Sequence, residues 1–158
     1  MAQPTHPTTP SPATATEDTA IRAPIQVKEV MTDEIMTMLP HQSFAEVVGM
    51  MANRSVRHML IVGADDCLHG VISDRDVLRA LSRTPDWNMK SVSEIMTRDS
   101  FTTTPDSAIS AAVRIMLENR INCLPVIGTD GRVCGILTST DLLKAYEQIQ
   151  RRFEELAP

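Results

Sequence analysis

The sequence predicts an α+β fold in which one strand–helix–strand–strand–helix unit occurs twice in tandem. The first observation is an internal repeat, because residues 27–80 align without a gap on residues 92–145. The second is that both copies carry the same order of amphipathic and apolar segments. The third is size: a single copy would be marginally stable by itself, so we expect the two copies to pack against each other.

The repeat is clearest in its opening segments and in its turn residues. Residues 27–32 read Val-Lys-Glu-Val-Met-Thr, and residues 92–97 read Val-Ser-Glu-Ile-Met-Thr. The same register matches Thr37 with Thr102, Pro40 with Pro105, Gly63 with Gly128, Gly70 with Gly135 and Asp76 with Asp141. Matched turn residues over this length indicate a duplication.

Each copy contains two predicted helices. Phe44, Val47, Val48 and Met51 follow an i, i+3, i+4, i+7 spacing that predicts an amphipathic helix, and residues 109–116 repeat it. We expect the second helix of each copy to begin near Asp74 or Ser139, and a short strand to precede each of the matched prolines.

A β-hairpin is predicted between the two helices of each copy. In the first copy the apolar runs 59–62 and 68–72 flank the turn sequence Gly-Ala-Asp-Asp. In the second copy the runs 124–127 and 133–137 flank Gly-Thr-Asp-Gly. Short apolar runs on either side of Gly and Asp are typical of a hairpin.

Composition excludes several classes of function. The 158 residues are 42% hydrophobic and only 3% aromatic, so we expect Met, Val, Ile and Leu to fill the core. A net charge of -5 argues against nucleic-acid binding. No apolar run is long enough to insert in a membrane, and no secretory signal is visible. Three cysteines at irregular spacing suit a reducing cytoplasm.

The chain divides into five predicted segments. The expected boundaries are a disordered Pro/Thr/Ala-rich tail at 1–24, a first repeat at 25–81, a linker at 82–91, a second repeat at 92–146 and a helix extension at 147–158. In the extension an apolar stripe continues through Tyr146, Ile149, Phe153 and Leu156. This stripe either covers the chain's own core or pairs with a second subunit, and we favour a homodimer.

A short motif ends each hairpin. Residues 70–76 read Gly-Val-Ile-Ser-Asp-Arg-Asp, and residues 135–141 read Gly-Ile-Leu-Thr-Ser-Thr-Asp. A Ser or Thr followed three residues later by an acid fits a helix capping box. The same side chains could instead bind a ligand, and the duplication does not decide between the two interpretations because both copies need caps.

These motifs, with the opening segments and Leu-Pro-Val-Ile at 124–127, resemble the CBS (cystathionine β-synthase) domain family. The resemblance covers about residues 27–146 and implies a stand-alone, Bateman-type pair. Such pairs have pseudo-two-fold symmetry and two clefts between the repeats, which bind AMP, ADP, ATP or related compounds such as S-adenosylmethionine or NAD. It implies a regulatory protein without catalytic activity or metal, acting on an effector protein in trans as an energy sensor.

The resemblance also implies roles for individual residues. Asp76 and Asp141 would accept the ribose hydroxyls. Ser73 and Thr138, with the N–H groups of the following helix, would bind phosphate, as would Arg57 and His58. The remaining expected cleft residues are Val56, Val71, Ile121, Asn122, Ile136, Lys28 and Ser93. We expect unequal clefts, because Asn122 and Cys123 stand in repeat 2 where repeat 1 has Arg57 and His58. The cleft with Ser73 is therefore the better phosphate site.

Two other classes of function remain open. One is a structural or interaction protein with vestigial clefts. The other is a redox- or metal-responsive module that uses the three cysteines. Cys67 and His69 with Cys134 could suggest a metal site, although their spacing matches no standard zinc pattern, and Cys123 is either a buried small hydrophobe or a thiol in the cleft that oxidation could reach. Arg57 and His58 could also be an ordinary solvated pair at a strand edge.

Overall fold

The computed structural model describes residues 25–156. The prediction for the tail at 1–24 lies outside the described residues. The first copy contains η1 (Val27–Glu29), β1 (Thr37–Met38), α1 (Phe44–Arg54), β2 (His58–Val62), β3 (Leu68–Ser73) and α2 (Asp74–Arg83). After η2 (Trp87–Met89), the second contains α3 (Val92–Ile95), α4 (Ile109–Asn119), β4 (Cys123–Ile127), β5 (Val133–Thr138) and α5 (Ser139–Leu156).

The predicted element order is confirmed, with two differences. The opening segments form the short helices η1 and α3, which the apolar pattern did not indicate. The strand expected before Pro105 is reduced to one parallel bridge between Thr103 and Val126, whereas β1 forms a two-residue parallel pair with β2.

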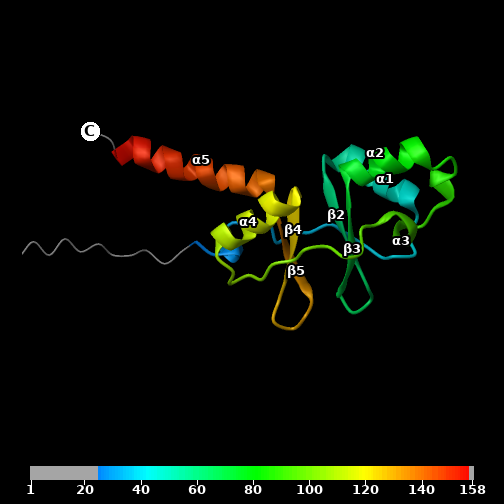
Figure 1. Ribbon diagram of the computed structural model, residues 1–158, viewed down its shortest axis with the longest axis horizontal. Helices are drawn as coiled ribbons and strands as arrows, with labels where there is room; N and C mark the ends of the chain where they lie inside the picture. Colours follow the sequence, from blue (N-terminus) through cyan, green and yellow to red (C-terminus); the bar gives the residue numbers. More distant parts are fainter. Residues whose placement is uncertain (1–24, 157–158) are drawn as a thin grey trace, which may run out of the picture.

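The two hairpins lie side by side in the middle of the molecule, with their turns at the same end (Figure 1). β2 pairs with β3 and β4 pairs with β5, both antiparallel and with an irregularity at the equivalent place. The turns contain Asp66 at φ 62° and Gly131 at φ 81°. Glycine adopts this left-handed conformation freely and Asp tolerates it, which explains these residue types at equivalent positions.

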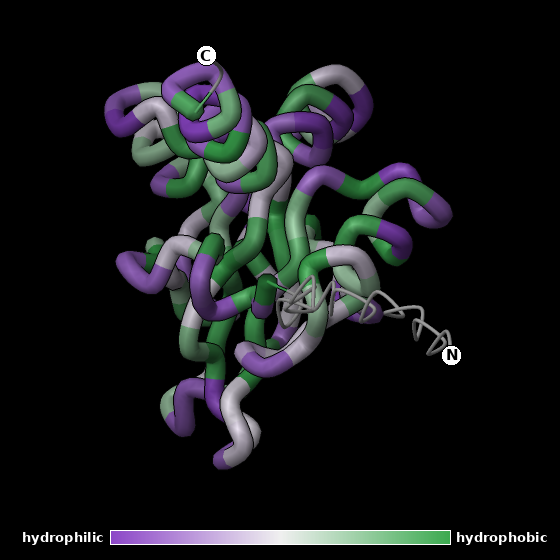
Figure 2. The backbone as a smooth tube through the Cα atoms, turned by 90° about the vertical axis from the view of Figure 1, so that its left-hand side faces the viewer, coloured by the Kyte–Doolittle hydropathy of each residue, from purple (hydrophilic) through white to green (hydrophobic). Residues whose placement is uncertain are grey.

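The core is aliphatic and sulfur-rich, as the composition predicts. Figure 2 shows the central strands as hydrophobic and the hairpin turns as mostly hydrophilic. Phe44 is fully buried and meets Trp87 edge-on, with ring centroids 6.4 Å apart. Leu60, Val71, Cys123 and Ile136 form a separate cluster that joins the two hairpins.

The opening segment of each repeat packs on the other repeat. Val27 belongs to the core cluster of α4, β4 and β5, whereas Val92 and Met96 belong to the cluster of α1, β2 and β3. Backbone hydrogen bonds of 2.9 Å link Thr32 with Ile136 and Thr97 with Val71 in both directions. The opening segments are thus exchanged between the repeats: residues 27–32 pack on repeat 2, and residues 92–97 pack on repeat 1. We call this arrangement the segment exchange.

The last helix extends away from the hairpins (Figure 1). Tyr146, Phe153 and Leu156 are 61%, 66% and 81% exposed, so the stripe does not cover the chain's own core in the described residues. No helix between residues 25 and 156 has the length and apolar character needed to cross a membrane.

Candidate functional site

Two cavities lie at the junction of the repeats, at equivalent positions. The first has a volume of about 420 Å³ and the second about 390 Å³. Both have walls from both repeats. The first cavity combines residues 57–58 and 71–76 of repeat 1 with residues 97–101 and 120–123 of repeat 2. The second combines residues 32–36 and 55–58 with residues 136–140, Asn122 and Lys144.

Many of the expected cleft residues line these cavities. Ser73, Asp76, Val71 and Ile121 line the first cavity. Val56, Ile136 and Thr138 line the second. Arg57, His58 and Asn122 line both, because the two cavities adjoin at the start of β2 and β4.

Ser73 and Asp76 form a complete capping box at the start of α2. The Ser73 hydroxyl donates to Asp76 Oδ2 at 2.7 Å, the Ser73 N–H donates to the same oxygen at 2.9 Å, and the Asp76 N–H donates to Ser73 Oγ at 3.3 Å. The capping interpretation is confirmed, and it leaves Asp76 Oδ1 for a further partner. That partner is Arg79, whose Nη1 lies 3.1 Å away.

The start of α2 differs from the predicted phosphate site. The Asp74 N–H donates to the Arg57 carbonyl at 2.9 Å, and the Arg75 N–H donates to Asp74 Oδ1 at 2.9 Å. Together with the Asp76 N–H in the capping box, these bonds occupy the first helical donors. The Ser73 hydroxyl proton is occupied as well, so donors for a phosphate must come from side chains.

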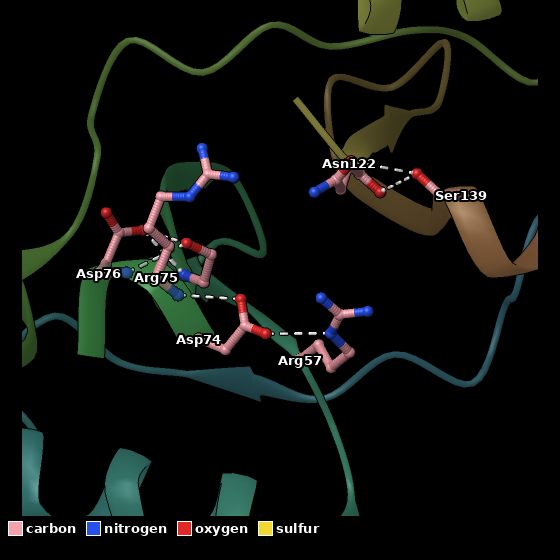
Figure 3. A network of polar contacts seen from close by, with 7 residues as sticks. Arg57, Asp74, Arg75, Asp76, Asn122 and Ser139 are labelled. Carbon is pink, nitrogen blue, oxygen red and sulfur yellow. Dashed lines mark hydrogen bonds and ion pairs between the residues drawn. The ribbon is translucent and has the colours of Figure 1, made fainter. Parts of the chain in front are cut away.

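Arg57 faces the start of α2 (Figure 3). Its Nε lies 3.0 Å from Asp74 Oδ2, and the two side chains are 66% and 46% exposed. Burial raises the pKa of Asp74, but the hydrogen bond and charge of Arg57 outweigh it and hold that pKa below its usual range. In the second repeat Asn122 and Ser139 stand in place of this ion pair, and the Ser139 hydroxyl donates to Asn122 Oδ1 at 3.4 Å.

His58 and Cys123 occupy equivalent positions at the starts of β2 and β4. Burial lowers the pKa of His58, the charge of Arg57 acts in the same direction, and Asp74 and Asp76 oppose it. Burial and the charge of Asp76 raise the pKa of the Cys123 thiol to about 12. Both groups are therefore held toward their neutral forms beside the first cavity.

Thr138 and Asp141 repeat the capping box at the start of α5, but the carboxylate is buried. Thr138 donates to Asp141 Oδ2 from its N–H at 2.8 Å and from Oγ1 at 2.6 Å. Thr32 Oγ1 donates to Asp141 Oδ1 at 3.0 Å. Asp141 is 8% exposed, and in the described part of the chain it does not line the second cavity. This position differs from the ribose-binding role that we expected. The reason is that Thr138 and Thr32 donate to both carboxylate oxygens and hold the side chain between the two segments.

Lys28 and Ser93 also lie outside both cavities, as far as residues 25–156 define them. Lys28 Nζ pairs with Asp106 Oδ1 at 2.7 Å, and the Ser93 hydroxyl lies 3.0 Å from that of Ser91. The reason is the segment exchange, since η1 and α3 pack on the opposite repeat.

Sequence reasoning missed part of the first cavity. Arg75 lies within the motif but was assigned no role, whereas Asp99, Phe101 and Arg120 come from repeat 2. The internal repeat contains a signal for these positions, because Asp99 and Phe101 correspond to Glu34 and Met36 of the second cavity. That correspondence becomes informative only when the segment exchange is known.

The redox- or metal-responsive alternative gains no support from geometry. The pKa of Cys67 is raised, first by its hydrogen bond to Asp65, and burial raises the pKa of Cys134. Between residues 25 and 156 no three His, Cys, Asp or Glu side chains are grouped to hold a metal ion.

The fold and its cavities define a tandem-repeat α+β module with two equivalent clefts between the repeats. The CBS domain model matches residues 27–83 and 92–148. The chain therefore belongs to the CBS domain family and is a tandem CBS pair.

Individual relatives and solved structures are similar to this chain over most of its length. The inosine-5'-monophosphate dehydrogenase of Methanocaldococcus jannaschii is 29% identical over 133 residues, which are 83% of this chain and 26% of that enzyme. The chain thus spans about a quarter of that relative's length. The CBS domain pair of protein MJ0100, in complex with 5'-methylthioadenosine and S-adenosyl-L-methionine, matches with a TM-score of 0.72 and 27% identity, covering 80% of this chain and 98% of that one. The structure of CBSX2 in complex with AMP matches with a TM-score of 0.70 and 26% identity, covering 79% of this chain and 98% of that one.

Proposed function

We propose that this CBS pair is a regulatory module that binds an adenosine-type ligand in the first cavity and signals to a partner protein in trans. The observation that carries the proposal is that this cavity brings the motif of repeat 1 together with Arg57, Arg75 and Arg120. Its volume of about 420 Å³ lies within the range of small-molecule sites. The two matching structures that contain AMP, 5'-methylthioadenosine or S-adenosyl-L-methionine support the ligand class.

Asp76 would accept the two ribose hydroxyls. Its Oδ2 is held by Ser73, while its Oδ1 pairs with Arg79, which is 56% exposed. The Asp76 side chain is only 14% exposed, but Arg79 lies on the solvent side of this i,i+3 pair and water solvates its guanidinium once it is released. Such a pair contributes on the order of 1 kcal/mol, which the hydrogen bonds of a diol to the same oxygen replace. Hydrogen bonds to a charged acceptor are the stronger ones, which favours this exchange.

The walls of the cavity match the other parts of the ligand. Val71, Ile121 and Pro125 offer an apolar surface for adenine, and Phe101, 50% exposed, offers a ring for stacking. Arginine side chains would bind phosphate in place of the occupied helical N–H groups.

The charge of the cavity favours a ligand with few phosphates. Its three arginines are opposed by Asp74, Asp76 and Asp99, and Arg57 is already paired with Asp74. Little net positive charge remains, so we expect AMP or 5'-methylthioadenosine to bind more tightly than ATP. We assign recognition and not catalysis to this site, because the Ser73 hydroxyl is committed to the capping box and the Cys123 thiol is held protonated.

Thermal unfolding against AMP, ADP, ATP, 5'-methylthioadenosine, S-adenosylmethionine and NAD tests the proposal. Ligand at a hundred times its dissociation constant adds about 2.7 kcal/mol, a midpoint rise of about 5 to 10 °C. Asp76→Asn should remove the rise. Asp86→Asn makes the same change at an exposed position outside the cavity and should keep it. No rise with any ligand would contradict the proposal.

A second candidate function, an interaction protein with unused clefts, is favoured by the exposed apolar stripe of α5. In that case Asp76→Asn would leave partner binding unchanged, whereas Phe153→Ser would weaken it. We place the module in the cytoplasm, where adenosine compounds are available and thiols stay reduced.

A further inference from the structure

Thr32 and Thr97 occupy equivalent positions in the two repeats, but their side chains differ in what they bind. Each exchanges two backbone hydrogen bonds of 2.9 Å with a strand of the other repeat, Thr32 with Ile136 and Thr97 with Val71. The Thr32 hydroxyl also donates to Asp141 Oδ1 at 3.0 Å. Within residues 25–156 the Thr97 hydroxyl makes no corresponding bond to Asp76.

The two equivalent carboxylates, Asp76 and Asp141, therefore differ in their hydrogen-bond partners and in their exposure. Asp141 has Thr138 on one oxygen and Thr32 on the other, is 8% exposed, and does not face the second cavity in the described residues. Asp76 lines the first cavity, and its second oxygen is paired with the exposed side chain of Arg79.

Binding a ribose has different consequences at these two positions. At Asp76 the diol displaces a solvent-exposed guanidinium that water can solvate at once. At Asp141 it must displace Thr32, which breaks a contact between residues 109 apart in the chain and loosens the segment that carries η1. A ligand that must break a tertiary contact before it binds loses that energy from its affinity.

We propose that Asp141 is a structural latch between the repeats and that the chain therefore binds one adenosine ligand, in the first cavity. This rests on the proposed function. The second cavity has the basic side chains Arg57 and Lys144, and among the described residues its one carboxylate is Glu34, which belongs to the opening segment. The motif of repeat 2 therefore offers this cavity no carboxylate at the position that Asp76 occupies in the first. The two copies of one motif thus have separate tasks, recognition at Asp76 and cohesion at Asp141.

The latch is tested without any ligand, by a thermal double-mutant cycle on the full chain. Thr32→Val removes only the hydroxyl and leaves a buried acceptor unpaired, so we expect the midpoint to fall by about 3 to 8 °C. In an Asp141→Ala background the same change should shift it by less than about 1 °C. Thr97→Val is the matched control, with a shift of less than about 2 °C expected. Equal shifts in both backgrounds would overturn the latch.

Occupancy is tested by equilibrium dialysis with radiolabelled AMP. We expect one AMP per chain, at least tenfold weaker binding in Asp76→Asn, and binding within about twofold of wild type in Thr32→Val and Asp141→Asn. Circular dichroism confirms that each variant is folded. Two AMP per chain, or equal losses in Asp76→Asn and Asp141→Asn, would overturn single occupancy while leaving the proposed function intact. If no adenosine compound binds, the proposed function and single occupancy both fail, whereas the latch is still decided by the thermal cycle.

Discussion

The backbone of Gly70 lies so close to the Thr97 carbonyl that a Cβ atom on Gly70 would be 2.7 Å from that oxygen. The glycine at the start of the first motif is thus required by packing, since it lets the opening segment of the other repeat reach the strand. Val71, its neighbour, is the residue that exchanges backbone hydrogen bonds with Thr97.

Gly70→Ala should lower the free energy of unfolding by about 1 to 3 kcal/mol, because the methyl group meets backbone that cannot move away easily. Gly135→Ala is the matched control. There the nearest atom, 2.7 Å away, is the Sδ of Met31, a flexible side chain, although the Thr32 carbonyl follows at 3.1 Å. Urea unfolding measures both. A larger effect at Gly135 would contradict this interpretation of the contact.

Phe44→Ala should cost about 3 to 5 kcal/mol, because the ring is fully buried and its removal leaves a cavity. The fluorescence of Trp87, the single tryptophan of the chain, should change in the same variant, since the two rings are in contact. Phe101→Ala, at a ring that is 50% exposed, should change the unfolding free energy by less than about 1 kcal/mol. An unchanged Trp87 spectrum in Phe44→Ala would contradict the packing.

Stability should depend on pH through His58. Its pKa lies below the ordinary value of 6.5 in the folded protein, so the unfolded chain binds more protons in the window below 6.5. The contribution of His58 is therefore complete above pH 6.5 and is lost as the pH falls toward the folded value. One group changes the unfolding free energy by at most about 1.4 kcal/mol per pH unit.

The measurement is urea unfolding of wild type and His58→Gln between pH 5 and 8. The variant should lose part of the pH dependence in the window below 6.5, and the difference between the two curves isolates His58 from the other histidines. Parallel curves would show that burial does not shift this group.

The three thiols should differ in reactivity. Cys123 is 8% exposed and its pKa is raised to about 12, so almost no thiolate forms near neutral pH. Iodoacetamide at pH 7.5 should modify the more exposed Cys67 and Cys134 first, and Cys123 only after denaturation. Peptide mass spectrometry locates the label. Rapid labelling of Cys123 in the folded protein would revive the redox-responsive alternative.

Self-association through α5 should be sensitive to its exposed stripe. Phe153→Ser and Leu156→Ser remove two large apolar side chains from this surface. They should weaken any dimer without lowering the thermal midpoint of the repeats, because the stripe is not part of the described core. Sedimentation velocity measures the association state, with Leu117→Ser on α4, 73% exposed, as the control.

Much of the fold could be predicted because it depends on local patterns. The stripe beginning at Phe44 and the turn sequences near Gly63 and Gly128 act within a few residues of themselves, and the structure contains the expected helices and hairpins. The short helices η1 and α3 were not predicted, because segments of three or four residues carry too little periodicity to distinguish a helical turn from a strand.

The candidate site could be predicted only in part. The motif located Ser73 and Asp76 because cap and cavity wall are built from neighbouring residues. Phe101 and Arg120 reach the same cavity from the other repeat, and Lys28 is carried away from it by the segment exchange. Such placements depend on contacts between distant segments, which no local spacing records.

The sequence by itself determined the duplication, the order of elements and the family, because these follow from periodicity and from residue types at fixed intervals. The tertiary structure alone decided which repeat each opening segment joins and which of the two equivalent carboxylates lines one of the two clefts between the repeats. Asp76 and Asp141 stand in equivalent motifs, and Thr97 and Thr32 stand in equivalent segments. Whether a hydroxyl reaches a carboxylate depends on a separation of about 3 Å across the packed repeats, and packing sets that separation.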